Sequence, residues 1–104
     1  MPVDSVEFCK ALADETRQHI LEMLLEGELC VTEIVGAFDI SQPTISHHLD
    51  VLSQLGLLTS RKAGRQVYYA TDRDRVLDCC GELQSRFGLA TQNWKSSGSA
   101  RSWK

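Results

Sequence analysis

One segment of the chain, SQPTISHHLDVLSQLG at residues 41–56, constrains the fold more than any other. Ser41 is a favourable N-cap, and Pro43 falls in the first helical turn, where its missing N–H group leaves no helical hydrogen bond unmade. Apolar side chains recur at helical spacing on one face: Ile45, Leu49, Leu52 and Leu55. The opposite face carries Gln42, Thr44, Ser46, His47 and Asp50, and apart from the aspartate these are short hydrogen-bonding groups. We therefore predict an amphipathic helix that ends at Gly56 and has an unusually polar outer edge.

A shorter helix is predicted directly before it, at residues 32–38, with Thr32 as its cap. Two helices joined by so short a turn form a helix-turn-helix, in which the first helix braces the second and the second enters the major groove of DNA. Gln42 suits a bidentate contact with adenine, and Thr44 or Ser46 can bond to either strand. His47 can donate to a base or to a phosphate. The polar edge therefore predicts double-stranded DNA as the partner.

Two β-prone segments follow, at residues 57–62 and 66–71, and a glycine-containing turn at residues 63–65 joins them into a hairpin. Its basic side chains are Arg61, Lys62 and Arg65. Such a hairpin after a helix-turn-helix is a wing that lies along the DNA backbone or minor groove. We predict a mainly α fold with a small β-hairpin, a winged helix-turn-helix. The alternative is a small helical bundle whose hairpin is purely structural.

Three more helices complete the predicted domain. The first covers residues 6–13, the second begins after the N-cap Asp14 and ends at Gly27, and the last begins at about Asp72. The first helix has an apolar stripe at Val6, Cys9 and Ala13, with Phe8 and Leu12 beside it. The last has one at Val76, Cys80, Leu83 and Phe87. We expect one winged-helix DNA-binding and dimerisation domain over residues 1–90 and a disordered polar tail over residues 91–104.

Charge is distributed unevenly along the chain, whose formal net charge is −3. Residues 1–40 carry two basic and nine acidic side chains, whereas residues 41–71 carry three basic and one acidic. The middle block can thus face phosphate while the acidic third points away. No apolar run is long enough for a membrane span, and the first residues lack the pattern of a secretory signal. We therefore expect a cytoplasmic protein, with no membrane association and with its four cysteines as thiols.

Three segments together resemble the arsenical-resistance repressor family (ArsR/SmtB), over about residues 6–87: CKALADETRQHILEMLLEGELCVTEIVGAF, SQPTISHHLDVLSQLGLL and GRQVYYAT. The resemblance implies a dimeric winged-helix repressor that leaves its operator when an effector binds. It also implies that the first and last helices form the homodimer interface. A two-fold dimer would bind an inverted-repeat operator whose half-sites lie one helical turn apart, ~34 Å.

The family's usual effector sites are incomplete in this sequence. A three-cysteine metalloid site at the third helix corresponds here to ELCVTEIVGAF, which keeps Cys30 but has Thr32 and Val35 at the other positions. A zinc site of Asp and His on the last helix corresponds to DRDRVLDCCGELQ, which has no histidine. Zinc prefers Cys and His ligands, so this carboxylate set is a poor zinc site.

The remaining thiols, Cys9, Cys79 and Cys80, are the candidate ligands for As(III) or Sb(III) as effector. Adjacent helical residues lie ~100° apart, so Cys79 and Cys80 can both edge one pocket. Cys9 lies on the first helix, which the family fold packs against the last, so the site could lie within or between subunits. Cys30 could replace Cys9. Cys9 and Cys80 also lie on apolar stripes, where cysteine is often a small hydrophobe.

Two alternative hypotheses stay open: a repressor of the same fold whose thiols sense oxidation, and a repressor without a metal effector. His48 is predicted to be structural, and His19 to lie at the surface or at the boundary of the core. The sequence has no CxxC, no recognisable Cys–His pair with an orienting acid and no phosphate-binding glycine loop, so we predict that the chain is not an enzyme. A last alternative hypothesis is an interaction module that keeps the fold without binding DNA.

Overall fold

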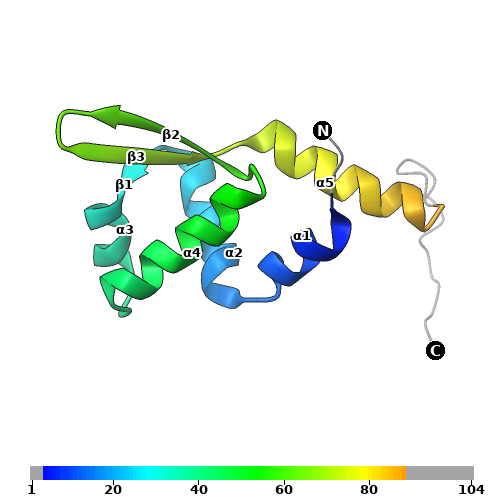
Figure 1. The fold of residues 1–104 in the computed structure, drawn as a ribbon, viewed down its shortest axis with the longest axis horizontal. Helices are drawn as coiled ribbons and strands as arrows, with labels where there is room; N and C mark the ends of the chain where they lie inside the picture. Colours follow the sequence, from blue (N-terminus) through cyan, green and yellow to red (C-terminus); the bar gives the residue numbers. More distant parts are fainter. Residues whose placement is uncertain (1–3, 89–104) are drawn as a thin grey trace.

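The computed structural model describes residues 4–88, and the predicted tail at residues 91–104 lies outside this range. Five helices and three short strands make up the described part (Figure 1). In chain order they are α1 (Ser5–Leu12), α2 (Glu15–Glu26), β1 (Leu29–Cys30), α3 (Val31–Ala37), α4 (Gln42–Gln54), β2 (Leu58–Ala63), β3 (Gln66–Thr71) and α5 (Arg73–Arg86). This order confirms the mainly α architecture with a β-hairpin. No helix in residues 4–88 combines the length and apolar character of a membrane span.

The sheet has one strand more than the hairpin that the sequence predicts. Its order is β1-β3-β2, and both pairings are antiparallel. The additional strand β1 places Leu29 opposite Tyr69 and Cys30 opposite Tyr68. Two residues are too few to show the alternation by which a strand is recognised in sequence. The hairpin is therefore fixed to the helical body along one edge.

Local signals set most helix ends as predicted. The carboxylates of Asp4, Asp14 and Asp72 accept backbone N–H groups at the starts of α1, α2 and α5. Gly56, with φ of 76°, follows the end of α4. The prediction that Thr32 caps the third helix is wrong, because the N-cap is Cys30. There β1 continues directly into α3, and the backbone N–H of Cys30 donates to the Glu33 carboxylate at 3.0 Å.

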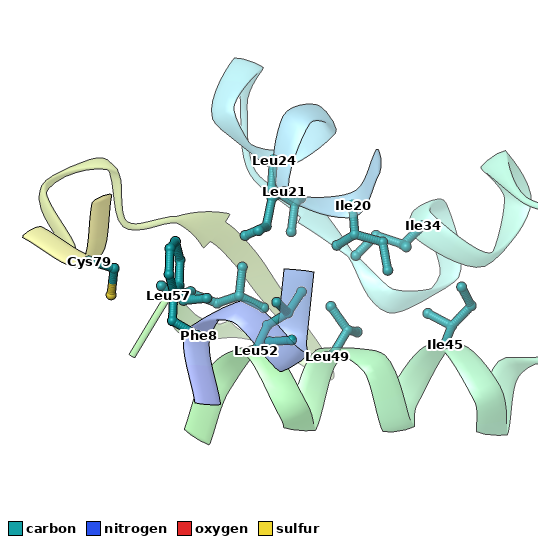
Figure 2. Close-up of a cluster of buried hydrophobic side chains, with 12 residues drawn as sticks. Phe8, Ile20, Leu21, Leu24, Ile34, Ile45, Leu49, Leu52, Leu57 and Cys79 are labelled. Atoms are coloured by element: carbon teal, nitrogen blue, oxygen red, sulfur yellow. The ribbon is translucent and has the colours of Figure 1, made fainter. Parts of the chain in front are cut away.

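Helix α4 contributes most of its predicted stripe to the core, and Leu55, just after the helix, is half-buried against it. Ile45, Leu49 and Leu52 are fully buried, and they pack with side chains from α1, α2, α3 and the residue after Gly56 (Figure 2). Those partners include Phe8, Ile20, Leu21, Leu24, Ile34 and Leu57. Because α3 packs against α4, both helices of the helix-turn-helix share the core of the domain. The polar edge of α4 is left on the outside.

The apolar stripes predicted on the two terminal helices lie largely outside the core of a single chain. Helix α1 buries Ser5, Phe8 and Ala11, so the predicted face with Val6 and Cys9 is exposed instead. Helix α5 buries Cys79 and exposes Cys80. Val76 and Leu83 are partly buried, as expected, but Phe87 is 72% exposed. Neighbouring positions on a helix differ by only ~100°, so spacing alone does not fix which arc meets the core.

Candidate nucleic-acid interface and cysteine positions

The N-terminal edge of α4 is exposed where the sequence predicts DNA contacts. Gln42, Thr44 and His47 are exposed, and Ser46 is half-buried. The Ser41 hydroxyl occupies the N-cap position but donates to the Thr44 hydroxyl oxygen at 3.1 Å instead of capping the helix. The first turn of α4 contains no acidic residue. No carboxylate within this turn therefore competes for the positive end of the helix dipole.

A partly buried contact behind α4 connects this helix to α2. Arg17 on α2 donates through Nη1 to Nδ1 of His48, at 3.1 Å, and through Nε to the carbonyl oxygen of Ala11, at 2.7 Å. Burial lowers the pKa of His48, and the charges of Arg17 and His47 lower it further, whereas Asp14 raises it. A neutral imidazole can accept this hydrogen bond. One guanidinium thus ties the end of α1 and the start of α2 to α4, as the structural role predicted for His48 requires.

The three predicted basic residues of the wing differ in their distance from the turn and in their contacts with other side chains. Lys62 and Arg65 are exposed, and Arg65 follows Gly64, whose φ of 63° makes the turn. Arg61 lies further from the turn, paired in register with Tyr68. Its Nε donates to both carboxylate oxygens of Glu28, at 2.9 and 3.0 Å, and its Nη2 also bonds to this carboxylate. That hydrogen bond lowers the pKa of Glu28. Arg61 is therefore exposed but already engaged within the chain.

The four cysteines are free thiols in different surroundings. Cys79 is only 2% exposed and lies at one end of the core, beside Phe8 and Leu57 (Figure 2), where burial raises the pKa of its thiol. Cys30 is buried, whereas Cys9 and Cys80 are exposed. Across residues 4–88 no group of three or more His, Cys, Asp or Glu side chains is placed to hold a metal ion. One chain by itself therefore does not assemble the three predicted thiol ligands.

Helix α5 is nevertheless connected to the end of α4. Nε of Arg75 donates to the carbonyl oxygen of Leu55 at 3.0 Å, and the backbone N–H of Asp72 donates to that of Leu57 at 2.9 Å. Sequence analysis missed this link, the Arg17–His48 contact and the role of Glu28. Each of these contacts joins residues far apart in the chain, and local sequence patterns do not predict such pairs.

A helix-turn-helix with a polar outer edge, followed by a β-hairpin with basic residues, defines the class of winged helix-turn-helix transcription regulators. The family described as "Bacterial regulatory protein, arsR family" matches residues 14–60. The chain belongs to this arsR family, which confirms the resemblance seen in the sequence.

Individual relatives agree with this assignment. The chain is 45% identical over 76 residues to the "Cadmium resistance transcriptional regulatory protein CadC homolog" of Staphylococcus aureus, covering 72% of this chain and 63% of that protein. It is 51% identical over 65 residues to the "Arsenical resistance operon repressor" of Escherichia coli (strain K12), covering 62% of this chain and 56% of that protein. The chain thus spans less than two thirds of either relative.

A solved structure described as a "Possible transcriptional regulator for arsenical resistance" superposes with a TM-score of 0.67 and 30% identity. The superposition covers 88% of this chain and 95% of that one. It confirms the winged helix-turn-helix fold. The relatives and the structural neighbours are transcription regulators and not enzymes, in agreement with the sequence-based prediction.

Proposed function

We propose that this protein is a cytoplasmic transcriptional repressor that binds double-stranded DNA through the outer edge of α4 and through the wing. The observation that carries the proposal is the exposed edge at Gln42, Thr44 and His47, backed by the fully buried Ile45 and Leu49. A rigid apolar back and a polar front are what a recognition helix requires, because its side chains must meet base edges in a fixed register. Ser46 completes the edge, and Lys62 and Arg65 contact phosphates.

The repressor acts as a homodimer through α1 and α5. These helices expose large apolar side chains: Val6 and Leu77 are each 61% exposed, and Phe87 is 72% exposed. Exposed apolar groups concentrated on two neighbouring helices are typical of a protein interface. A two-fold pair would place two α4 helices on one side of the DNA, so the operator is an inverted repeat.

The effector is a soft metalloid or metal, most simply As(III) or Sb(III), bound by thiolates of Cys9, Cys79 and Cys80. The names of the relatives connect the family to arsenic and cadmium, and thiolates are the ligands that soft ions prefer. Since one chain does not bring these thiols together, the site would draw on both subunits or require α5 to shift. Movement of α5 would reach α4 through the contact of Arg75 with Leu55, which couples the effector to DNA release.

DNA binding is tested with a duplex selected from a random library and measured by fluorescence anisotropy. We expect Gln42→Ala to weaken binding roughly tenfold or more, because a lost bidentate base contact is worth ~1–3 kcal/mol. The matched control is Gln54→Ala, an exposed glutamine at the other end of the same helix, which leaves binding unchanged. If the wild-type protein selects no sequence from the library, the proposal fails and an interaction module becomes the better interpretation.

Effector binding is tested by adding arsenite, under reducing conditions, to the protein–DNA complex. We expect wild-type release and no release from the double variant Cys79→Ala with Cys80→Ser, at nearly normal DNA affinity. Alanine is chosen at position 79 because a serine hydroxyl there would be buried. Cys30→Ala serves as the control for the alternative third ligand. Persistent release from the double variant overturns the proposed site, and release by peroxide but not arsenite favours the redox repressor.

A further inference from the structure

The Arg61 guanidinium is held from two sides. One edge, Nε with Nη2, faces the Glu28 carboxylate at hydrogen-bonding distance, with Nε 2.9 and 3.0 Å from its two oxygens. One face lies over the Tyr68 ring, with the central carbon 5.1 Å from the ring centroid. That edge is a fork with which arginine binds a phosphate or a carboxylate bidentately. In Arg61 it is already occupied by a carboxylate of the same chain.

The three partners belong to different strands or their flanks. Arg61 on β2 is opposite Tyr68 on β3, and Tyr68 is opposite Cys30 on β1. Glu28 lies just before β1, at the corner where α2 leads into the sheet. The contact between Arg61 and Glu28 therefore crosses the central strand β3 and ties the outer strand of the wing to the helical body. The wing is also attached to the body through the two-residue strand β1, and through the Thr71 hydroxyl on β3, which donates to the carbonyl oxygen of Leu21 on α2 at 2.8 Å.

The other two basic residues of the wing differ from Arg61. Among residues 4–88, neither Lys62 nor Arg65 forms an ion pair, and both side chains are exposed near the turn. Their charge is therefore not cancelled by an acidic partner, whereas Glu28 cancels the charge of Arg61 locally. A phosphate approaching the wing would meet net positive charge at Lys62 and Arg65 but a neutral pair at Arg61.

We infer that Arg61 is a positioning residue, which with Glu28 and Tyr68 fixes the angle of the wing, and that Lys62 and Arg65 make the phosphate contacts of the wing. This inference rests on the proposed DNA binding. It divides the predicted basic cluster into two roles. Arg61 acts through the placement of its neighbours, and the two residues nearer the turn act by charge.

Salt dependence of DNA binding separates the two roles. Each phosphate contact contributes about 0.9 to the slope of log affinity against log salt concentration. We expect Lys62→Ala and Arg65→Ala each to reduce this slope by about that amount. Arg61→Ala and Glu28→Gln should leave the slope unchanged and should each weaken binding at a given salt concentration, by about two- to fivefold as for a well-formed exposed ion pair. The double variant Arg61→Ala with Glu28→Gln should bind DNA no more weakly than either single variant. Glu22→Gln, which removes an exposed charge on α2, away from the wing and from α1 and α5, is the control.

Hydrogen exchange of the free protein tests the positioning role without DNA. We expect Arg61→Ala and Glu28→Gln to speed exchange of the amides that pair β1 with β3, whereas Lys62→Ala does not. Unchanged exchange in both variants overturns the inference. The inference is also overturned if Arg61→Ala reduces the salt dependence of DNA binding as much as Lys62→Ala does. Tighter DNA binding by Glu28→Gln would overturn it as well, because Glu28 would then be competing with phosphate for Arg61. If no variant binds DNA in a sequence-selective manner, the proposed function fails, and the exchange result still decides the role of Arg61.

Discussion

Helices α4 and α5 are both amphipathic and of similar length, but they bury their apolar residues differently. Helix α4 buries Ile45, Leu49 and Leu52 in the core and keeps a polar edge outside. Helix α5 buries only Cys79 completely, leaves Leu77 and Phe87 exposed, and extends away from the body of the domain (Figure 1). The apolar face of α4 is covered by other elements of its own chain, whereas α5 keeps apolar side chains in contact with water.

This difference indicates what each helix can bind. A polar edge without carboxylates at a helix N-terminus suits a polyanion with hydrogen-bonding groups, which is the surface of a DNA groove. Exposed leucine and phenylalanine suit another apolar protein surface, because burying them removes area from water. We therefore propose that α4 binds DNA and that α5, with α1, binds a second copy of the chain. The following experiments test that division, beginning with the largest expected effect.

Leu77→Asp should convert the protein to a monomer. In a two-fold dimer the substitution occurs twice, and each copy forfeits the ~1.5–3 kcal/mol gained by burying a leucine, so the loss is roughly 3–6 kcal/mol. Sedimentation velocity over a concentration series measures the change. The control is Leu25→Asp on α2, where the leucine is also exposed but belongs to neither α1 nor α5. Equal dissociation by both variants, or by neither, would contradict the assignment of α5.

His48→Leu should destabilise α4 from behind. The substitution leaves Nη1 of Arg17 without its hydrogen-bond acceptor on α4, with the Asp14 carboxylate 4.0 Å away as its remaining partner, and a poorly satisfied donor at a partly buried position costs about 1–3 kcal/mol. Urea unfolding at pH 7.5 measures the loss. His48→Asn, which keeps an acceptor near the position of Nδ1, should lose less.

The same histidine should make stability depend on pH. The pKa of His48 is lowered in the folded state from its ordinary value of 6.5, so the unfolded chain binds the proton more readily. Stability is then fully present above about pH 6.5 and declines as the pH falls toward the folded-state pKa. Unfolding of His48→Asn should lack this decline, whereas His19→Asn, which alters an exposed ring outside this contact, should retain it. A decline that survives in His48→Asn would assign it to another group.

The smallest expected effect is a difference in stability between variants of the N-cap residues of α5 and α4. Asp72 accepts the backbone N–H of Arg75 at 3.2 Å, so Asp72→Ala should cost about 1 kcal/mol of unfolding free energy. Ser41 makes no capping hydrogen bond, so Ser41→Ala should change stability by less than about 0.5 kcal/mol. Matched urea titrations measure both. A larger loss for Ser41→Ala would show that the hydroxyl contact with Thr44 also stabilises the start of α4.

Several features of the fold and the site follow from sequence because they depend on neighbours along the chain. The stripe at Ile45, Leu49 and Leu52 needs only helical periodicity, and the exposed polar edge is its geometric complement. The end of α4 at Gly56 and the cap at Asp14 are equally local. The helix-turn-helix, the wing and the family resemblance all rest on signals of this kind.

Tertiary contacts decided what periodicity leaves open. Cys79 and Cys80 are adjacent, and only the packing of α5 beside α1 determines that Cys79 is buried and Cys80 exposed. The pairing of Arg61 with Glu28 joins residues 33 positions apart, so it depends on the sheet that brings them together. The sequence by itself determined the five helices, the hairpin and their apolar positions, since those are properties of one helix or strand, whereas the two-residue strand β1 formed only through its pairing with β3. The arc that meets the core and the partner of each charge required the assembled chain, because both depend on atoms that other elements supply.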